Sequence, residues 1–233
     1  MLTPVVLLHG FASTARHWDR VSAALPPGRY TPIALNLAAA DPLTPDGVAG
    51  LVAASTDQRF VLVGYSMGGR VALHTALKIP DRIARLVLIS TSAGIEDRHE
   101  HAARKAADDL LADEIEQDSI SSFVARWRAL PLFAQDPGWV HDEVADDERR
   151  CTPAQLAAML RGLGVGAMAP MWERLGELRM PVAVLAGEHD AAYEALGRRL
   201  AASMNDSAFR SVPGAGHRVA LQSPGEVVSA LAG

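Results

Sequence analysis

The sequence of 233 residues is poor in cysteine, in clustered positive charge and in long apolar runs. Its single cysteine, Cys151, allows no disulfide framework and suits a reducing compartment. The net charge of −5 and the lack of any basic run argue against a nucleic-acid partner. No apolar stretch is long enough to span a membrane, and the apolar start from Leu2 to Leu8 lacks the basic residues of a signal peptide. We therefore expect a cytoplasmic protein with neither nucleic acid nor a membrane among its partners.

The composition that remains is that of an ordinary globular protein, with 49% hydrophobic and 21% charged residues. At this length the chain can bury one good core, so we expect one domain with an insertion rather than two independent domains. We expect it to be a monomer or a weak homo-oligomer.

Short apolar runs alternate with helical patterns along much of the chain. The runs are expected to form buried strands at 5–8, 30–35, 60–63, 86–89, 182–186 and 209–212. Because each strand is followed by a helical pattern, the alternation predicts a parallel sheet with right-handed crossovers. The sequence therefore predicts an α/β fold, with a mostly parallel central sheet and helices on both of its faces.

The alternation stops between residues 95 and 176, where helical patterns follow one another. Two apolar stripes are expected there: Ala103, Ala106, Ala107, Leu110, Leu111 and Ile115, then Ile120, Phe123, Val124 and Trp127. A capping box from Thr152 to Gln155 predicts a further helix. This segment holds 16 acidic and 9 basic residues, against 11 and 13 in the rest of the chain. We predict a helical cap (95–176) inserted after the strand at 85–90, with residues 1–94 and 177–233 forming the core.

The stretch around which the chain is organised is Gly64-Tyr65-Ser66-Met67-Gly68, between a predicted strand and an amphipathic helix. Strand, sharp turn and helix are the context that a nucleophile elbow requires. Side chains at the two glycines would collide with the neighbouring strand and helix, and the turn strains Ser66. The serine hydroxyl is then presented at the carboxyl end of the sheet, in front of the free N–H groups of the helix.

A serine hydroxyl is a poor base and a poor nucleophile at neutral pH, so it needs an imidazole and a carboxylate to orient that imidazole. Asp190 follows the predicted strand at 182–186, and His217 lies in a Gly-flanked loop after the last strand. Singly, Asp190 could be a helix cap and His217 a loop residue. With an elbow present, their order along the chain predicts a catalytic triad of Ser66, Asp190 and His217.

Two backbone donors are expected to form an oxyanion hole beside the serine, one at Met67 and one at Phe11 in the first strand–helix loop. We interpret His9, which precedes that loop, as a structural residue that braces it. His99 and His101 lie two residues apart, so a helix points their rings in different directions. We therefore predict no metal site.

These residues, in this order, resemble the α/β-hydrolase superfamily over essentially the whole chain. Narrower stretches resemble the 2-succinyl-6-hydroxy-2,4-cyclohexadiene-1-carboxylate synthases of menaquinone biosynthesis: 8–11, 64–70, 123–127, 130–133 and 160–166. The elbow is shared by many hydrolases. The stretches in the cap are more specific, because caps diverge quickly among unrelated members.

The resemblance implies a lyase on a hydrolase scaffold, with no metal or organic cofactor. The substrate of the family carries carboxylates and an enolpyruvyl ether, and the enzyme removes a proton and eliminates pyruvate. In that reaction Ser66, activated by His217 and Asp190, acts as the base and forms no acyl-enzyme. The oxyanion donors stabilise the charge that develops on the succinyl carbonyl.

A small anionic substrate needs cations, and the resemblance implies that Arg70, within the elbow motif, is one of them. Tyr65 and Trp127 also match family positions at the substrate, and packing within the core or the cap is the alternative for each. The resemblance further implies two cap arginines at the substrate, one being Arg98 or Arg104 and the other Arg149 or Arg150.

Two departures from the family pattern keep other functions open. The family often has a lysine where this chain has Ala192, and a histidine where it has Ala220. The missing cation favours an alternative in which the same triad hydrolyses a carboxylic ester or thioester through an acyl-enzyme. A third alternative is a non-catalytic receptor for a small hydrophobic signal, against which the intact triad and its flanking glycines argue.

Overall fold

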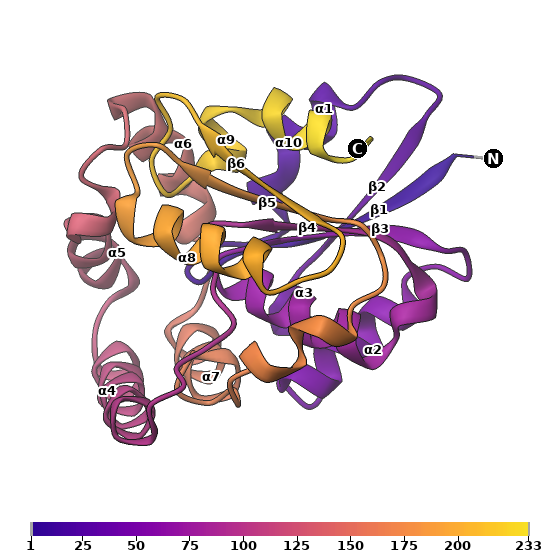
Figure 1. Cartoon of the computed structure of the whole chain (residues 1–233). Helices are drawn as coiled ribbons and strands as arrows, with labels where there is room; N and C mark the ends of the chain where they lie inside the picture. Colours follow the sequence, from indigo (N-terminus) through magenta and orange to yellow (C-terminus); the bar gives the residue numbers. More distant parts are fainter. Residues whose placement is uncertain (1, 233) are drawn as a thin grey trace.

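The computed structural model describes residues 2–232, and its centre is a six-stranded sheet (Figure 1). The strands are β1 (Thr3–Leu8), β2 (Tyr30–Leu35), β3 (Phe60–Tyr65), β4 (Ile83–Ile89), β5 (Val182–Gly187) and β6 (Ser207–Val212). They are ordered β2-β1-β3-β4-β5-β6, and every neighbouring pair is parallel. The predicted α/β fold is therefore confirmed. Residues 1 and 233, the ends of the predicted core ranges, lie outside the described residues.

Helices cover both faces of the sheet (Figure 1). One face packs against α1 (Asp19–Ala24) and α10 (Pro224–Ala230), and the other against α2 (Pro45–Ala54), α3 (Met67–Lys78) and α8 (Ala191–Ala202). Shorter helices complete the connections: η1 (Ala15–Trp18), η2 (Leu37–Ala39), η3 (Pro80–Arg82), η4 (Pro131–Phe133), η5 (Trp172–Glu177) and α9 (Val219–Gln222). Across residues 2–232, no helix has both the length and the apolar character needed to cross a membrane.

The two faces explain why the strands are apolar without alternation. In β1, Val5 and Leu7 belong to the core under α1 and α10, whereas Val6 and Leu8 belong to the core under α2 and α3. All four side chains are fully buried. Successive residues of a strand point to opposite faces, so a sheet covered on both faces needs apolar residues at every position.

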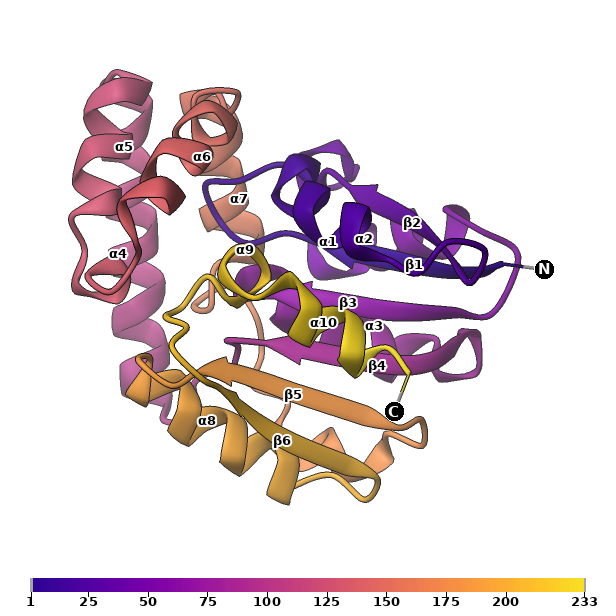
Figure 2. The same ribbon diagram turned by 90° about the horizontal axis from the view of Figure 1, so that it is seen from above.

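Four helices between β4 and β5 lie together at one end of the sheet (Figures 1 and 2). They are α4 (Arg98–Gln117), α5 (Ile120–Arg128), α6 (Gly138–Glu148) and α7 (Pro153–Leu163), and together with the segments that join them we call them the cap. The predicted capping box opens α7, where the Thr152 hydroxyl accepts from the N–H of Gln155 and the Gln155 side chain accepts from the N–H of Thr152.

The apolar stripe predicted on α4 is wrong in part. Ala103, Ala106 and Ala107 are exposed, Leu110 is 65% exposed, and the buried residues of the helix are Asp108, Ala112 and Ile115. Alanine methyl groups gain little from burial. The face of α4 that meets α7 instead places Ala112 and Ile115 in the core cluster that includes Leu156 and Leu160 of α7, and polar contacts accompany them.

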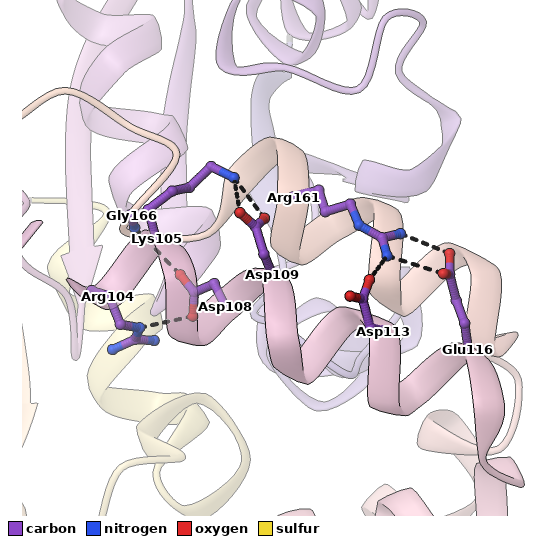
Figure 3. A network of polar contacts seen from close by, with 8 residues as sticks. All are labelled: Arg104, Lys105, Asp108, Asp109, Asp113, Glu116, Arg161 and Gly166. Carbon is purple, nitrogen blue, oxygen red and sulfur yellow. Dashed lines mark hydrogen bonds and ion pairs between the residues drawn. The ribbon is translucent and has the colours of Figure 1, made fainter. Parts of the chain in front are cut away.

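Polar contacts of this kind are visible between α4 and α7 (Figure 3). Arg161 of α7 binds Asp113 and Glu116 of α4. A further pair, Lys105 with Asp109, lies within α4. The stripe predicted on α5 fits the structure better, because Phe123 and Val124 are buried there.

The two connections that join the cap to the sheet run side by side. The N–H of Met171, which follows the cap, donates to the carbonyl of Ala93, which precedes it, at 2.7 Å. The indole N–H of Trp172 donates to the carbonyl of Gly94 at 2.9 Å. The chain therefore leaves the sheet after β4 and returns toward β5 through one hydrogen-bonded junction.

Candidate active site

The turn between β3 and α3 holds Ser66 in an uncommon backbone conformation, with φ 54° and ψ −114°. The flanking glycines permit it. A Cβ atom at Gly64 would lie 2.4 Å from the carbonyl oxygen of Gly68, and one at Gly68 would lie 2.3 Å from the carbonyl oxygen of His9. Only residues without a Cβ atom allow the strand, the turn and the helix to approach this closely. The serine is therefore fixed between β3 and α3, at the carboxyl end of the sheet.

Three side chains that are distant in the sequence meet at this turn. The Oγ atom of Ser66 lies 3.1 Å from Nε2 of His217, and Nδ1 of His217 lies 2.6 Å from Oδ2 of Asp190. His217 and Asp190 are buried, in the loops that follow β6 and β5. Because parallel strands all end at one edge, these loops and the elbow converge. The structure thus brings together the three residues expected from the sequence.

The loop after β1 lies beside the serine and is braced by His9. The Nε2 atom of His9 accepts from the N–H of Leu37 at 3.0 Å, and its Nδ1 lies 2.8 Å from the carbonyl of Gly10. A ring that accepts at Nε2 is neutral and donates at Nδ1, and burial accordingly lowers the pKa of His9. This geometry agrees with the interpretation of His9 as a structural residue.

Two backbone N–H groups near the serine have no acceptor in the described part of the chain. They are those of Phe11, in the loop after β1, and Met67, at the first position of α3. Both residues line the same cavity as Ser66. The first N–H groups of a helix have no partner within it, so they can bind an anionic oxygen. These two positions are the ones expected from the sequence.

The cavity beside Ser66 has a volume of about 250 Å³ and lies between the sheet and the cap. Its polar walls come from Ser66, His217, Arg70, Arg104 and Tyr193, and its apolar walls include Phe11, Trp127 and Phe133. A cavity of mixed character with a few convergent polar groups is typical of a site for a small molecule.

Arg70 is the most unusual residue of this cavity. It is 7% exposed, and its Nε is buried without a hydrogen-bond partner in residues 2–232, none of which forms an ion pair with it. Burial lowers the pKa of Arg70; the charge of Arg104 also lowers it, while Tyr193 and Asp108 act in the opposite direction. A buried cation without a protein counter-ion is costly unless a ligand supplies the negative charge. The cavity is therefore suited to an anion.

Of the cap arginines predicted at the substrate, Arg104 lies at the cavity, whereas Arg98 and Arg150 do not. Arg104 lines the cavity, and its Nε donates to Oδ1 of the buried Asp108 at 2.8 Å (Figure 3). Arg98 lines a separate pocket with His101, and Arg150 is exposed and does not line the cavity. The structure does not bring Arg98 or Arg150 to Ser66. The sequence could not exclude them from the substrate site, because it does not reveal which face of a cap helix is covered.

Tyr65 and Trp127 line the cavity and also pack tightly, so both interpretations of these residues have support. Tyr65 is buried and stacks on His17 with ring centroids 4.6 Å apart. The rings of Trp127 and Phe11 are nearly perpendicular, with their centroids 5.0 Å apart. Ala192, where the family often has a lysine, is exposed at the start of α8 and does not line the cavity.

Tyr193 was not predicted, although it lies in the cavity. Its ring centroid is 4.5 Å from that of His217, and its backbone N–H donates to Oδ1 of Asp190 at 3.4 Å. The sequence offered one signal for Tyr193, its position one turn after Asp190. The first turn of α8 begins at the carboxyl edge of the sheet, where Asp190 also lies.

A buried ion network beside His217 was also not predicted. Arg218 binds Asp136 and Glu148 of the cap, and Glu148 also accepts from Nε of Arg128 at 2.6 Å. Burial raises the pKa of Glu148, while the two arginines lower it. This network connects the cap to the residue next to His217.

Comparison with known proteins identifies the family. The sequence model of the alpha/beta hydrolase family matches residues 5–230. The chain belongs to this family. A Bacillus subtilis protein provisionally named 2-succinyl-6-hydroxy-2,4-cyclohexadiene-1-carboxylate synthase is 34% identical, over 97% of this chain and 88% of its own. A Klebsiella pneumoniae protein named as the same synthase is 28% identical, over 98% of this chain and 92% of its own.

Solved structures support the same assignment to this family of enzymes. The structure of MenH from S. aureus matches with a TM-score of 0.90 and 28% identity, covering 97% of this chain and 91% of that one. A thermophilic esterase from Thermogutta terrifontis matches with a TM-score of 0.77 but only 23% identity, which shows the shared fold alone. The chain is thus an α/β-hydrolase-fold enzyme that resembles the synthases in sequence and in structure.

Proposed function

We propose that this enzyme eliminates pyruvate from an enolpyruvyl-cyclohexene carboxylate in menaquinone biosynthesis, as a 2-succinyl-6-hydroxy-2,4-cyclohexadiene-1-carboxylate synthase. The similarity to proteins that carry this name covers nearly the whole chain. We also propose a cytoplasmic location for the enzyme, with a small anionic molecule as its partner.

In the proposed reaction Ser66 is the base. Its Oγ takes the proton from the carbon beside the succinyl carbonyl, while Nε2 of His217, at 3.1 Å, takes the hydroxyl proton. Asp190, at 2.6 Å from Nδ1, holds the ring orientation and stabilises the imidazolium that forms. The electron pair then shifts through the ring and expels the enolpyruvyl oxygen, which takes the proton from the His217 imidazolium. The enol so released becomes pyruvate, and the histidine returns to its neutral state.

Negative charge develops on the succinyl carbonyl oxygen as the proton leaves. The N–H groups of Phe11 and Met67, which have no acceptor in residues 2–232, are the proposed donors to that oxygen. Donors that are already oriented need no reorganisation as the charge develops, so they stabilise the transition state more than the ground state.

The observation that carries the proposal is the guanidinium of Arg70. It is buried in the cavity beside Ser66 without a protein counter-ion, and Arg104 lies in the same cavity. A guanidinium binds a carboxylate with two parallel hydrogen bonds, which suits a substrate that carries carboxylates. An enzyme for neutral esters gains nothing from such a group.

The alternative is hydrolysis of a carboxylic ester or thioester, in which Ser66 forms an acyl-enzyme. Ala192 favours it, because the chain lacks the lysine that the synthases often have at this position. The same three side chains and the same N–H donors serve that reaction. The two functions differ in whether the site prefers a polyanion.

Pyruvate release from the enolpyruvyl precursor, measured beside hydrolysis of p-nitrophenyl acetate, separates the two functions. Rapid pyruvate release with feeble ester hydrolysis is the expected result. Efficient ester hydrolysis without pyruvate release would contradict the proposed reaction and support the alternative.

A further inference from the structure

The last turn of α6 contains three consecutive acidic residues, Asp146, Asp147 and Glu148. The C-terminal end of a helix is the negative end of its dipole, and this turn has no basic residue to offset the three carboxylates. The arrangement is locally unfavourable. Asp146 is exposed, whereas Asp147 is 8% and Glu148 only 2% exposed. Carboxylates at the negative end of a helix, two of them buried, are unfavourable for the helix itself. Contacts with other parts of the chain must therefore stabilise Asp147 and Glu148.

Asp147 holds the loop that carries Phe11. Its Oδ2 accepts from the hydroxyl of Ser13 at 2.7 Å and from the N–H of Thr14 at 2.9 Å, and its Oδ1 accepts from the hydroxyl of Thr14. The thiol of Cys151, three residues beyond α6, lies 3.7 Å from the carbonyl of Ser13. The cap therefore contacts this loop at both the side chain and the carbonyl of Ser13.

The loop depends on such contacts. Ala12, between Phe11 and Ser13, has φ 55°, in the left-handed region that residues other than glycine rarely adopt. A residue held there persists only where its surroundings over-determine it. Asp147 accepts three hydrogen bonds from Ser13 and Thr14, the two residues that follow Ala12.

Glu148 reaches the other loop of the site. It accepts from Nη2 of Arg218 at 3.2 Å, and Arg218 directly follows His217 in the chain. A small cavity of about 20 Å³ marks the junction of α6 with both loops, because Phe11, Asp147, Glu148 and Arg218 all line it.

We propose that Asp147 and Glu148 are positioning residues, and that the end of α6 sets the loop of Phe11 and the loop of His217 for catalysis. The cap then controls the rate of the chemical step in addition to covering the substrate. This inference rests on the catalytic roles proposed above, and it applies equally to pyruvate elimination and to ester hydrolysis, because both need the same donors and the same histidine.

The effect is expected in kcat. Removal of an oxyanion donor lowers kcat about 10²- to 10³-fold, and a donor displaced rather than removed should lose part of that factor. We therefore expect Asp147→Ala to lower kcat by roughly tenfold or more, with KM changed less than about twofold. Asp147→Asn should recover most of the loss, because its amide oxygen can still accept from Ser13 and from the N–H of Thr14.

The matched control is Asp146→Ala, which removes the neighbouring carboxylate of the same helix turn. Asp146 binds only the exposed Arg149, so its replacement should leave kcat unchanged. Glu148→Gln, which keeps an acceptor for one arginine, tests the His217 side and should lower kcat with little change in KM. All variants are compared at a temperature well below the thermal midpoint of each, so that unfolding does not contribute.

The assays are pyruvate release and hydrolysis of p-nitrophenyl acetate. Equal kcat values for Asp147→Ala and Asp146→Ala would overturn the proposal, whether both are unchanged or both are lowered. A wild-type enzyme that hydrolyses the ester but releases no pyruvate would contradict the proposed reaction alone, since the ester assay still decides the role of Asp147. A loss of thermal stability in Asp147→Ala at unchanged kcat would show that the contact is structural only, and would also overturn the proposal.

Discussion

Replacement of Arg70 by methionine should change activity and stability in opposite directions. Methionine keeps the volume of the aliphatic stem and removes the guanidinium, whose Nε is buried and has no partner in residues 2–232. An unsatisfied buried donor costs about 1–3 kcal/mol, so the variant should gain roughly 1 kcal/mol in the free energy of unfolding. For a chain of this size that gain raises the thermal midpoint by about 2–4 °C.

The loss of activity follows from the bond that Arg70 is proposed to form with a substrate carboxylate. A hydrogen bond between charged groups contributes about 1.5–3 kcal/mol, and the bidentate geometry of arginine places the expected loss near the upper value. About 3 kcal/mol corresponds to a roughly 100-fold decrease in kcat/KM for the enolpyruvyl substrate. A neutral ester makes no such bond, so kcat/KM for p-nitrophenyl acetate should change less than about threefold.

The control is Arg174→Met, which removes the same charge from an exposed arginine that pairs with Glu177 and does not line the cavity. It should leave both activities and the thermal midpoint nearly unchanged. Steady-state kinetics on the two substrates and thermal unfolding supply the measurements. Equal losses on the anionic and the neutral substrate would refute the reasoning, because Arg70 would then be a structural residue of α3.

Three further changes test other parts of the site. Ser66→Ala should lower pyruvate release and ester hydrolysis by roughly 10³-fold or more, with the thermal midpoint nearly unchanged. Arg218→Met leaves Asp136 and Glu148 buried without that cation, so urea unfolding should show a loss of about 3–5 kcal/mol. Burial lowers the pKa of His17 to about 3, so the unfolded chain takes up a proton below about pH 6.5 while the native ring stays neutral. Stability should therefore fall between pH 6.5 and 3, and His17→Phe should make that slope shallower by roughly 1 kcal/mol per pH unit.

Each of these expectations can fail in a recognisable way. An active Ser66→Ala variant would contradict the proposed base. An unfolding free energy of Arg218→Met equal to that of the wild type would mean that the buried carboxylates find other partners. A pH slope that His17→Phe does not change would assign the acid sensitivity to another group.

The parts of the fold that could be predicted are those that local patterns determine. Gly64, Ser66 and Gly68 form a strand–turn–helix motif within a few residues, and its steric demands are visible in the sequence. Asp190 and His217 could be placed because each follows a strand of a parallel sheet, whose carboxyl ends share one edge. The two side chains therefore had to lie near the serine.

The parts that could not be predicted depend on how the cap helices are turned. On α4 the spacing of alanines predicted that one face is buried, whereas the structure buries the face that carries Asp108. The sequence therefore could not show which cap arginines point to the cavity. The pairing of Arg218 with Asp136 and Glu148 joins residues 82 and 70 positions apart, and no local signal connects them. Both cases depend on tertiary contacts between distant segments, which periodicity does not describe.

The junction between Ala93 and Met171 has an evolutionary consequence. The chain leaves and rejoins the sheet through hydrogen-bonded neighbours, next to the pairing of β4 with β5. Insertions, deletions or substitutions in the helical segment can leave this pairing in place, provided that the end of α6 keeps its contacts with the loops of Phe11 and His217. A lineage can therefore exchange the walls of its substrate cavity while it inherits the serine, the histidine and the aspartate unchanged, which makes new specificities accessible without refolding the scaffold.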